Sequence, residues 1–371
     1  MKAVILAGGE GTRLRPLTCL NPKPMLPFLN KPFMYNFISW LKFYGLKDII
    51  LSTCYLPDIF LKYFGDGKSI GVKLTCITEN SPLGTCGAVK NVEKYLDGSS
   101  FMVFNGDILT SLNLKDMISF HRQKNADITI SLTPVEDPTS YGLVPVDGKQ
   151  RVKEFLEKPK QEEIKTNLIN AGTYIIEPHI MDLVPKGKKY SFERELLPDA
   201  LSRGYKIFGF VSGSYWLDVG TPEKYLLAHH DMLERKVNFK FPYRETFQNI
   251  YVGKGTKFSK ENFVSGPVLV GEGTVIKKGA KILPLTVIGK NCSIFSGCEI
   301  SRSVVFDNCK IHKNCHIANS IISKNVTIGE NVKVSDMSII GDNSTIGNDN
   351  ILKNGIRINI NSKIDAEQII F

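Results

Sequence analysis

Long apolar runs are missing from this sequence. No run approaches the ~20 consecutive apolar residues that a membrane-spanning helix needs. A single cation, Lys2, precedes the first apolar run (3–7), and that run is too short for the hydrophobic region of a signal peptide. We therefore expect a cytoplasmic protein without a membrane partner.

Cysteine pairs at the spacing of metal or redox sites are missing too. The eight cysteines include no C-x-x-C pair, which argues against a zinc knuckle and against a disulfide framework. Cys292, Cys298, Cys309 and Cys315 are separated by 6, 11 and 6 positions, a spacing that indicates thiols facing a core.

Signatures of nucleic-acid binding are absent, although the net charge is +10. The sequence has no long Lys/Arg run, no RNP-type motif and no helix-turn-helix pattern. Basic side chains serve small phosphorylated ligands equally well. We expect no nucleic-acid partner.

Size and composition are those of a globular protein. A length of 371 residues predicts about two domains, and 42% hydrophobic with 23% charged residues is ordinary for such a chain. We expect one domain over residues 1–236 and another over 237–371.

The first part of the chain alternates apolar strands with helical stretches. Strands are expected at 3–7, 48–53, 73–78, 101–107, 128–135, 170–178 and 206–213, and helices at 31–45, 87–96 and 222–236. This alternation predicts an α/β fold with a doubly wound, mostly parallel sheet. Ligands of such sheets bind beyond the carboxyl ends of the strands.

From about residue 250, aliphatic residues recur every six positions, with two one-residue slips. The series is Val264, Val270, Ile276, Ile282, Ile288, Ile294, Ile300, Phe306, Ile311, Ile317, Ile322, Ile328, Val334, Ile340, Ile346, Leu352, Ile358, Ile364 and Ile370. Such a hexapeptide period predicts a parallel β-helix, with the aliphatic residue pointing into a triangular prism and small or Asn residues at its corners. Resemblance to known hexapeptide-repeat proteins implies a left-handed coil. Its flat, partly apolar faces favour homo-oligomer formation.

The opening string "MKAVILAGGEGTRLRPLTCLNPKPMLP" places three glycines and three cations behind the first strand. It contains neither a G-x-x-x-x-G-K-[ST] loop nor a G-x-G-x-x-G turn. Gly9 and Gly11 let the backbone approach a flat base or sugar, exposed N–H groups can face phosphate oxygens, and Arg13 and Lys23 supply positive charge for a triphosphate. Arg15 suits a surface role as well as a phosphate contact.

This string closely resembles the signature of the sugar-nucleotide pyrophosphorylases, nucleotidyltransferases that join a nucleoside triphosphate to a sugar 1-phosphate. Further family motifs follow in order: "PLGTCGAV" (82–89), "FNGD" (104–107), "EFLEKP" (154–159), "NAGTYI" (170–175) and "YWLDVGTPEKYL" (215–226). The resemblance covers nearly the whole chain. Its closest pattern transfers a guanylyl group from GTP to mannose 1-phosphate.

The resemblance implies three groups of site residues. Nucleotide-binding residues are Leu6, Ala7, Gly8, Gly9, Gly11, Thr12, Arg13, Lys23, Glu79, Pro82, Gly84 and Thr85; sugar-phosphate-binding residues are Gly142, Glu157, Lys158 and Asn170; catalytic residues are Arg13, Lys23, Asp107 and Asp218.

The chemistry agrees with this assignment. A sugar phosphate is already ionised at pH 7, so its attack on the α-phosphorus needs alignment and charge neutralisation rather than a general base. Asp107 and Asp218 each follow an apolar strand, and paired carboxylates with phosphate oxygens suit Mg²⁺ as the cofactor. The alternative for each carboxylate is a buried capping role.

Glu79 bears on the choice of base. A carboxylate offers only acceptors, which match the adjacent N1–H and N2–H donors of guanine, whereas uracil and thymine are better served by an amide. Guanine is favoured if the side chain faces the base edge. The alternative is that Glu79 points to solvent.

Three other functions stay open on the sequence. The same chemistry could use UTP or dTTP with glucose 1-phosphate, because no residue type reports the configuration at the sugar C2. A catalytically silent relative that binds the sugar nucleotide and regulates a partner is disfavoured by the presence of Arg13, Lys23, Asp107 and Asp218. His312 and His316 in the repeat would suit an acyltransferase, but no protruding loop interrupts the repeat.

Overall fold

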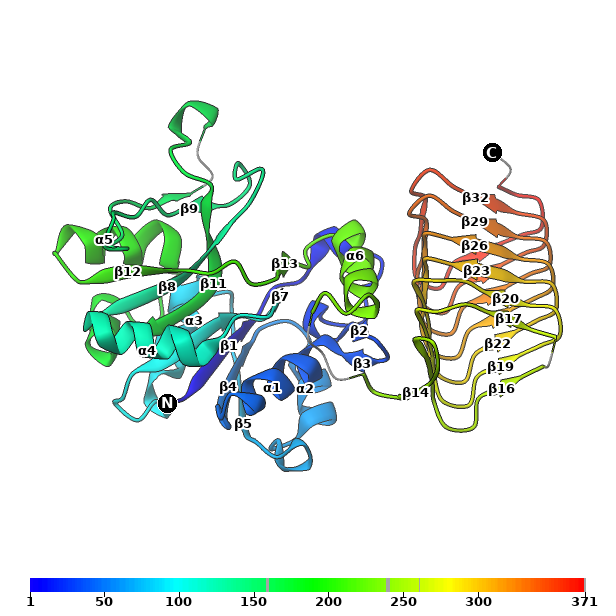
Figure 1. The fold of residues 1–371 in the computed structure, drawn as a ribbon, viewed down its shortest axis with the longest axis horizontal. Coiled ribbons are helices and arrows are strands. Elements are labelled where there is room, and N and C mark those ends of the chain that lie inside the picture. The colour runs from blue at the N-terminus through cyan, green and yellow to red at the C-terminus, as the bar shows by residue number, and fades with distance from the viewer. Residues whose placement is uncertain (158–159, 238–240, 260, 370–371) are drawn as a thin grey trace. The chain divides into compact units, whose positions relative to one another are not determined.

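The computed structural model describes residues 1–157, 160–237, 241–259 and 261–369 (Figure 1). They form two compact units, one of Met1–Glu10 with Phe37–Trp216 and one of Gly11–Asn36 with Leu217–Phe371. The second unit thus combines an early segment of the chain with its C-terminal part. The boundary expected near residue 236 stays a prediction.

A mixed sheet forms the centre of the first unit and has nine strands within the described residues. Their order is β10-β9-β11-β6-β1-β4-β5, with β8 paired to β11 and β12 paired to β8. The strands are β1 (Ala3–Ala7), β4 (Asp48–Thr53), β5 (Lys73–Thr78), β6 (Phe101–Asn105), β8 (Ile128–Pro134), β9 (Gly142–Leu143), β10 (Leu156–Glu157), β11 (Leu168–Ile176) and β12 (Ile207–Val211).

Parallel pairing joins β1 to β4 and β6, β4 to β5, and β8 to β12, while β11 runs antiparallel to β6 and β8. Short strands elsewhere are β2 (Pro27–Phe28), β3 (Lys31–Pro32), β7 (Ile108–Thr110) and β13 (Trp216–Asp218). The predicted α/β class is confirmed, and the sheet is mixed.

Helices cover the strands of this sheet. They are α1 (Phe33–Phe43), α2 (Pro57–Phe64), α3 (Gly84–Val92), α4 (Leu114–Lys124) and α5 (Leu197–Ser202). A further helix, α6 (Pro222–Leu233), belongs to the second unit. Helix α2 packs on β5, α3 on β1 and β4, and α4 on β8 and β12. Val4, Val103 and Tyr174 belong to the buried core between these layers.

Three sheets of mostly parallel strands build the C-terminal part of the second unit, the left-handed β-helix that the repeat and its resemblance predict (Figure 1). Within the described residues the sheets have eight, seven and six strands. The first holds β14 (Arg244–Phe247), β15 (Ile250–Val252), β18 (Val268–Val270), β21 (Thr286–Ile288), β24 (Val304–Val305), β27 (Ile321–Ile322), β30 (Ile339–Ile340) and β33 (Arg357–Ile358).

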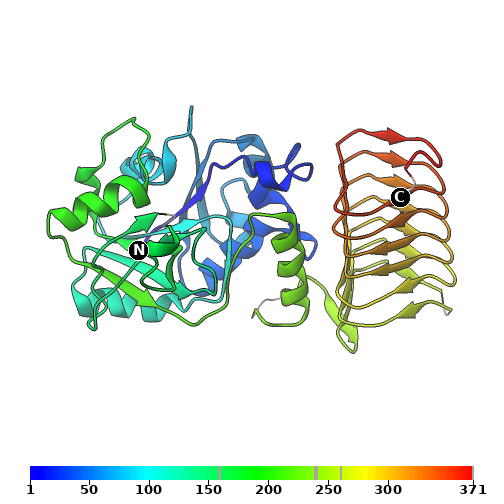
Figure 2. The same ribbon diagram turned by 90° about the horizontal axis from the view of Figure 1, so that it is seen from above.

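The second sheet holds β16 (Lys257–Phe258), β19 (Val275–Ile276), β22 (Ser293–Ile294), β25 (Lys310–Ile311), β28 (Thr327–Ile328), β31 (Thr345–Ile346) and β34 (Lys363–Ile364). The third holds β17 (Phe263–Val264), β20 (Lys281–Ile282), β23 (Glu299–Ser301), β26 (His316–Ala318), β29 (Lys333–Val334) and β32 (Ile351–Leu352). Figure 2 shows the coils stacked on one another.

Aliphatic side chains fill the inside of the coil as predicted, and the four cysteines expected there are buried among them. One position in the predicted series is wrong. Ile288 pairs with Val305, which belongs to the buried core, so the first slip falls before residue 306. Phe306 is not part of this core and packs instead against Tyr225 of α6, with ring centroids 6.3 Å apart.

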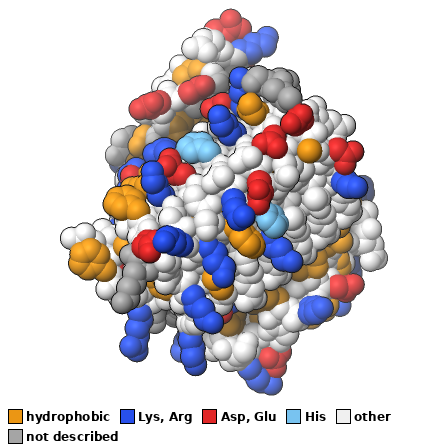
Figure 3. All heavy atoms as spheres, turned by 90° about the vertical axis from the view of Figure 1, so that its right-hand side faces the viewer, with side chains coloured by type: hydrophobic (Ala, Val, Ile, Leu, Met, Phe, Trp, Pro, Cys, Tyr) orange, Lys and Arg blue, Asp and Glu red, His pale blue; other side chains and the backbone are white. Residues whose placement is uncertain are grey.

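Asparagines turn the corners of the coil, as predicted. Their amides form a ladder in which Asn308 donates to Asn325 (3.1 Å), Asn325 to Asn343 (2.9 Å) and Asn343 to Asn361 (3.0 Å). All four have positive φ, a conformation that asparagine tolerates better than most residues. On the face in Figure 3, basic side chains are interspersed with acidic and uncharged ones.

Helices long and apolar enough to cross a membrane do not occur in the part of the chain that the structure describes.

Candidate active site

Strand β1 lies at the centre of the sheet, and the glycine turn follows the carboxyl end of this strand. A Cβ on Gly8 would lie 3.3 Å from the Cβ of Cys54 and 3.5 Å from Oε1 of Glu79, so the backbone passes close to these side chains. A Cβ on Gly9 would meet no atom within 4 Å. The bend therefore has room on its Gly9 side, as a site for a flat ligand requires.

The next turn of the signature belongs to the second unit and is tightly closed. Gly11 has φ +65°, and its carbonyl accepts hydrogen bonds from the Thr18 hydroxyl (2.8 Å) and the Leu14 N–H (2.9 Å). A Cβ on Gly11 would lie 3.0 Å from the Cβ of Lys23. The turn thus places the backbone of Thr12 and Arg13 close to Lys23.

Arg13, Lys23 and Asp218 are brought together in this unit. The Lys23 ammonium lies 3.7 Å from Oδ1 of Asp218, and both side chains are mostly buried. A Cβ on Gly220 would lie 2.7 Å from Nη2 of Arg13 and 3.2 Å from Oδ1 of Asp218. Gly220, which the sequence did not single out, therefore leaves space for the Arg13 guanidinium beside the carboxylate.

Asp107 follows the carboxyl end of β6, next to β1 in the first unit. The preceding Gly106 donates its N–H to the Leu6 carbonyl (2.9 Å), and a Cβ there would lie 2.6 Å from the same oxygen. Only glycine fits this close crossing. The crossing fixes where the backbone of Asp107 leaves the sheet.

Glu79 is buried, with 6% of its surface exposed, so it does not point to solvent. Its Oε1 accepts from the Ser52 hydroxyl (2.9 Å) and its Oε2 from the Leu83 N–H (3.0 Å). The carboxylate therefore ties the end of β4 to residues 82–89, the motif that the resemblance expects to hold the nucleoside (the nucleoside loop), and it lies beside Gly8. No motif in the sequence indicates a role for Ser52.

The nucleoside loop is also held from its other side. Tyr190 accepts from the N–H groups of Cys86 (3.0 Å) and Gly87 (2.9 Å) and donates its own N–H to Leu83 (2.9 Å). Gly84 has φ +72°, and a Cβ there would lie 2.8 Å from the Tyr190 carbonyl. Helix α3 consequently starts inside this loop, three residues before the predicted helix.

Two of the predicted sugar-binding residues face each other across a short ladder. Glu157 of β10 pairs with Gly142 of β9, and a Cβ on Gly142 would lie 3.1 Å from Oε2 of Glu157. Lys158, predicted to neutralise the sugar phosphate, lies outside the described residues.

A chain of hydrogen bonds joins β11, which carries the predicted sugar-binding residue Asn170, to the nucleoside loop. Asn170 donates to the Tyr174 hydroxyl (2.5 Å), which donates to Oε1 of Glu193 (3.2 Å). Oε2 of Glu193 accepts from the Thr85 hydroxyl (3.1 Å). The predicted residues Asn170 and Thr85 are therefore linked through two side chains.

Glu193 is a candidate functional residue that the sequence analysis missed. Burial, followed by the nearby charge of Glu157, raises the pKa of its carboxyl above the ordinary value, although the hydrogen bonds from Thr85 and Tyr174 oppose the rise. Perturbed carboxyl groups inside a cluster of polar residues are often functional. The residue stands in the polar stretch "KGKKYSFERE" (186–195), which shows no pattern that distinguishes it from surface charge.

The remaining predicted residues keep their expected places in the chain. Leu6 and Ala7 end β1, Pro82 lies in the nucleoside loop and Thr12 opens a 3₁₀ turn. Asp107 belongs to the first unit, whereas Arg13, Lys23 and Asp218 belong to the second. The roles of all these residues stay predictions.

The donor set fits a hard divalent cation. No group of three or more His, Cys, Asp or Glu side chains is placed to hold a metal among the described residues. Aspartate carboxylates are hard oxygen donors of the kind that Mg²⁺ takes in nucleotide sites, together with phosphate oxygens and water.

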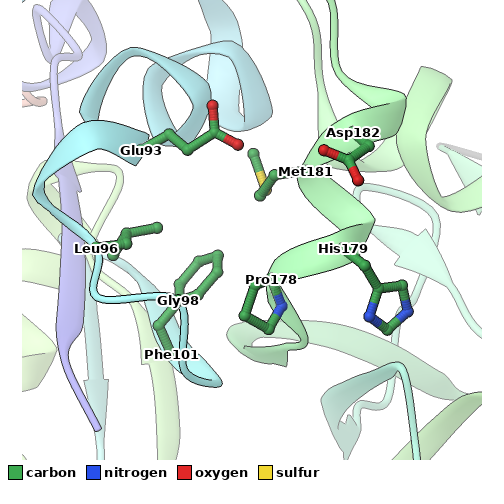
Figure 4. A pocket seen from close by; sticks show the side chains of 8 residues that line it. All are labelled: Glu93, Leu96, Gly98, Phe101, Pro178, His179, Met181 and Asp182. Carbon is green, nitrogen blue, oxygen red and sulfur yellow. The ribbon is translucent and has the colours of Figure 1, made fainter.

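A hollow of about 350 Å³ lies elsewhere in the first unit (Figure 4). Its lining includes Phe101, which begins β6, and Pro178, which follows β11. It therefore lies at the opposite end of β6 from Asp107. Glu93 and Asp182 also line this hollow, and Asp182 offers a control carboxylate remote from the candidate site.

Family comparisons agree with this architecture. Residues 2–235 match the nucleotidyl transferase family, and residues 247–367 match the EIF2B subunit epsilon LbH domain. The fold and the glycine turn followed by basic residues define a nucleotidyltransferase with a β-helix tail. The chain belongs to the nucleotidyl transferase family.

Relatives resemble the chain over most of its length. It is 39% identical to the mannose-1-phosphate guanylyltransferase of Mycobacterium tuberculosis, covering 82% of this chain and 79% of that one. It is 33% identical to the UTP–glucose-1-phosphate uridylyltransferase of Synechocystis, covering 83% of each. The crystal structure of HddC from Yersinia pseudotuberculosis, complexed with GMP-PN, covers 61% of this chain and 97% of its own at 37% identity and a TM-score of 0.54.

Proposed function

We propose that the protein transfers a guanylyl group from GTP to mannose 1-phosphate, giving GDP-mannose and pyrophosphate. The observation that carries the choice of base is the buried Glu79 carboxylate, which lies beside Gly8 at the glycine bend. A carboxylate matches the paired donors of guanine. The mycobacterial guanylyltransferase, with its 39% identity, supports the choice of both substrates.

The reaction is an in-line displacement at the α-phosphorus. An oxygen of the sugar phosphate forms the new bond to phosphorus, and the bond to the leaving pyrophosphate breaks. Arg13 and Lys23 neutralise the triphosphate, so that the anionic nucleophile can approach it. The attacking phosphate is ionised at pH 7, so no side chain has to remove a proton.

The sugar phosphate is held by the first unit. Glu157 accepts hydrogen bonds from sugar hydroxyls, Asn170 and the backbone of Gly142 complete the pocket, and Lys158 pairs with the phosphate. These contacts align the attacking oxygen, which lowers the entropic part of the barrier.

Asp107 and Asp218 would hold Mg²⁺. When bound, the ion withdraws charge from the α-phosphate and makes the phosphorus more electrophilic. The two carboxylates would otherwise repel the substrates, so the ion and the basic side chains are needed together.

A second candidate is uridylyl or thymidylyl transfer to glucose 1-phosphate. The Synechocystis uridylyltransferase, at 33% identity and 83% coverage, supports it. A catalytically silent regulatory subunit has no comparable support, because Arg13, Lys23, Asp107 and Asp218 are all present. Cytoplasmic location and homo-oligomer formation, in part through the β-helix, stay predictions.

A substrate panel tests the proposal. Purified protein with Mg²⁺ would receive each of five nucleoside triphosphates with mannose 1-phosphate or glucose 1-phosphate, and pyrophosphate release would be followed. We expect the highest kcat/KM with GTP and mannose 1-phosphate. Preference for UTP or dTTP with glucose 1-phosphate would establish the second candidate, and no release with any pair would reject both.

Glu79→Gln is expected to reduce kcat/KM for GTP about tenfold relative to UTP and dTTP, because the amide replaces one acceptor by a donor that opposes guanine. The amide can keep both anchors, since its oxygen can accept from the Leu83 N–H and its nitrogen can donate to the Ser52 oxygen. Competition assays with mixed nucleoside triphosphates measure the ratio.

Ser52→Ala is the matched control for this change. It removes one anchor of the carboxylate but keeps its charge, so all nucleoside triphosphates should be affected alike. An unchanged GTP preference in Glu79→Gln would show that this side chain does not read the base.

Glu193→Gln is expected to lower kcat/KM about tenfold, because charge-assisted hydrogen bonds to Thr85 and Tyr174 become neutral ones. Acidification should reduce wild-type activity as Glu193 gains a proton, and its raised pKa places this loss at higher pH than for an ordinary Glu. The variant cannot titrate there, so its profile should lack this acidic limb.

Glu195→Gln, two residues further on, is the control, because Glu195 caps Ser191 and is not part of this hydrogen-bond chain. Identical acidic limbs in wild type and Glu193→Gln would exclude the proposed positioning role.

A further inference from the structure

One face of the β-helix packs against the signature segment within the second unit. The contacting residues lie in strands of the eight-stranded sheet or within two residues after them: Ile288 of β21, Phe306 after β24, Asp342 after β30 and Arg357 of β33. Their partners lie in residues 11–36 and in α6. The eight-stranded face of the β-helix is thus in contact with the segment that carries Arg13 and Lys23.

Arg357 reaches the backbone of the loop itself. Its Nη1 donates to the carbonyl oxygens of Arg13 (3.2 Å) and Arg15 (3.3 Å), which bracket Leu14. In a continuing 3₁₀ turn the Arg13 carbonyl would accept from residue 16, but Pro16 has no N–H. The β-helix therefore supplies a donor that the local sequence cannot.

A second contact anchors the segment further along. The Asn21 amide lies 3.5 Å from Oδ2 of Asp342, whose Oδ1 accepts from the Lys324 N–H (2.9 Å) and from the Ser323 hydroxyl. Asp342 is buried, and a buried carboxylate needs such partners. Asn30 adds a donor to the Ile288 carbonyl at 2.8 Å.

Helix α6 packs between residues 11–36 and the β-helix. The Tyr225 hydroxyl donates to the Pro27 carbonyl, and its ring packs edge-on against Phe28 with centroids 4.9 Å apart. On the β-helix side, Tyr225 faces Phe306, and His230 lies 3.2 Å from the Arg302 carbonyl. Figure 1 shows α6 beside β2 and β3. Segment, helix and coil therefore form one packed layer.

Charge around Arg357 is balanced in the same layer. Burial tends to raise the pKa of Glu223 in the first turn of α6, but the hydrogen bond with Thr221, its backbone contact and the charge of Arg357 together lower it. Glu223 thus stays ionised near the Arg357 guanidinium. Its negative charge offsets the repulsion between Arg357 and the basic side chains of the loop.

We propose that Arg357 is a positioning residue. Through it, the eight-stranded face of the β-helix holds the loop that carries Arg13 and Lys23 in the conformation that binds the triphosphate. The inference rests on the proposed function for the identity of that loop. It gives the tail a part in catalysis separate from any part in assembly: the β-helix fixes the backbone from which the Arg13 guanidinium extends.

The test compares Arg357→Ala with Lys363→Ala in the full-length protein. Lys363 lies in β34, the strand that follows β33 in the chain and belongs to the seven-stranded sheet, and its side chain is highly exposed. Lys363→Ala therefore removes one positive charge, as Arg357→Ala does, without removing a contact to the loop. Asn21→Asp is a second variant, because it sets a carboxylate against Asp342. Hydrogen–deuterium exchange of the amides in residues 11–19 and KM for each substrate would be measured.

We expect Arg357→Ala and Asn21→Asp to speed loop exchange about tenfold and to raise KM for the nucleoside triphosphate about fivefold, with KM for the sugar phosphate unchanged. Lys363→Ala should match wild type in both readouts. The inference is overturned if Arg357→Ala behaves like Lys363→Ala, or if exchange rises while KM for the nucleotide does not.

Failure of the proposed function has a different signature. Wild-type protein would then release no pyrophosphate with any substrate pair, whereas the exchange comparison would still show whether Arg357 holds the loop.

Discussion

Asp107→Asn is expected to cut turnover at least ~100-fold, because it removes a metal-binding charge from the reacting phosphates. The side chain keeps its size, and Asp107 follows the Gly106 crossing rather than lying in the core. Unfolding temperature should therefore stay close to that of wild type. Steady-state pyrophosphate release and thermal unfolding measure the two quantities.

Asp182→Asn is the control for this prediction. It removes a carboxylate from the same unit, at the hollow beyond the opposite end of β6, and should leave turnover unchanged. Near-normal turnover in Asp107→Asn would remove this carboxylate from the mechanism.

Asp218→Asn should also reduce turnover at least ~100-fold, for a second reason besides metal charge. Its carboxylate lies 3.7 Å from the Lys23 ammonium, so the variant also removes the partner that holds this cation. Lys23→Met alone should slow the reaction, and the double variant should lose less than the product of the two single effects. A double-mutant cycle on kcat/KM measures this coupling.

Asp231→Asn supplies a matched control in the same unit. Asp231 of α6 pairs with Lys236, which follows the helix, at 2.8 Å, a lysine–aspartate pair of the same kind outside the candidate site. Its loss should lower stability without changing kcat. Fully multiplicative effects at Lys23 and Asp218, or a rate near wild type in Asp218→Asn, would contradict the assignment.

Much of the fold was predictable because it depends on local patterns. The strands over 3–7, 48–53 and 73–78 have the predicted bounds, since each is a short apolar run with polar or glycine residues at its ends. The β-helix was predictable because its inward positions repeat along the chain. The slip before Phe306 was misplaced because Val305 and Phe306 are both apolar, and only strand pairing decides which faces inward.

The candidate site was predictable where a motif carries it. Six predicted residues stand within or beside quoted motifs, and the structure gives each a polar contact or a close neighbour. They are Glu79, Thr85, Asn170, Arg13, Lys23 and Asp218. Glu193 lies outside these motifs, and Gly220 lies inside one without any pattern that indicates its packing role. Glu193 matters through a hydrogen-bond chain, and Gly220 through a neighbour more than 200 positions away.

Contacts between distant parts of the chain were out of reach for the same reason. Arg357 and Arg13 are 344 positions apart, and no period or spacing connects them. The sequence could place each in its own element but could not show that a residue of the β-helix donates hydrogen bonds to the loop that carries Arg13.

The proposed function depends on one arrangement of charge. We propose that basic side chains on the glycine-rich loop and a divalent ion on two carboxylates bring two phosphate groups together, and that Glu79 and Glu193 hold the loops around them. Each variant above removes one part of this arrangement.

A crystal structure with Mg²⁺, a non-transferable GTP analogue and mannose 1-phosphate tests this claim most directly. We expect a triphosphate against Gly8–Gly11 with Arg13 and Lys23 on its oxygens, and a metal ion held by Asp107 and Asp218. An empty glycine bend, with both carboxylates turned away from any bound phosphate, would contradict it.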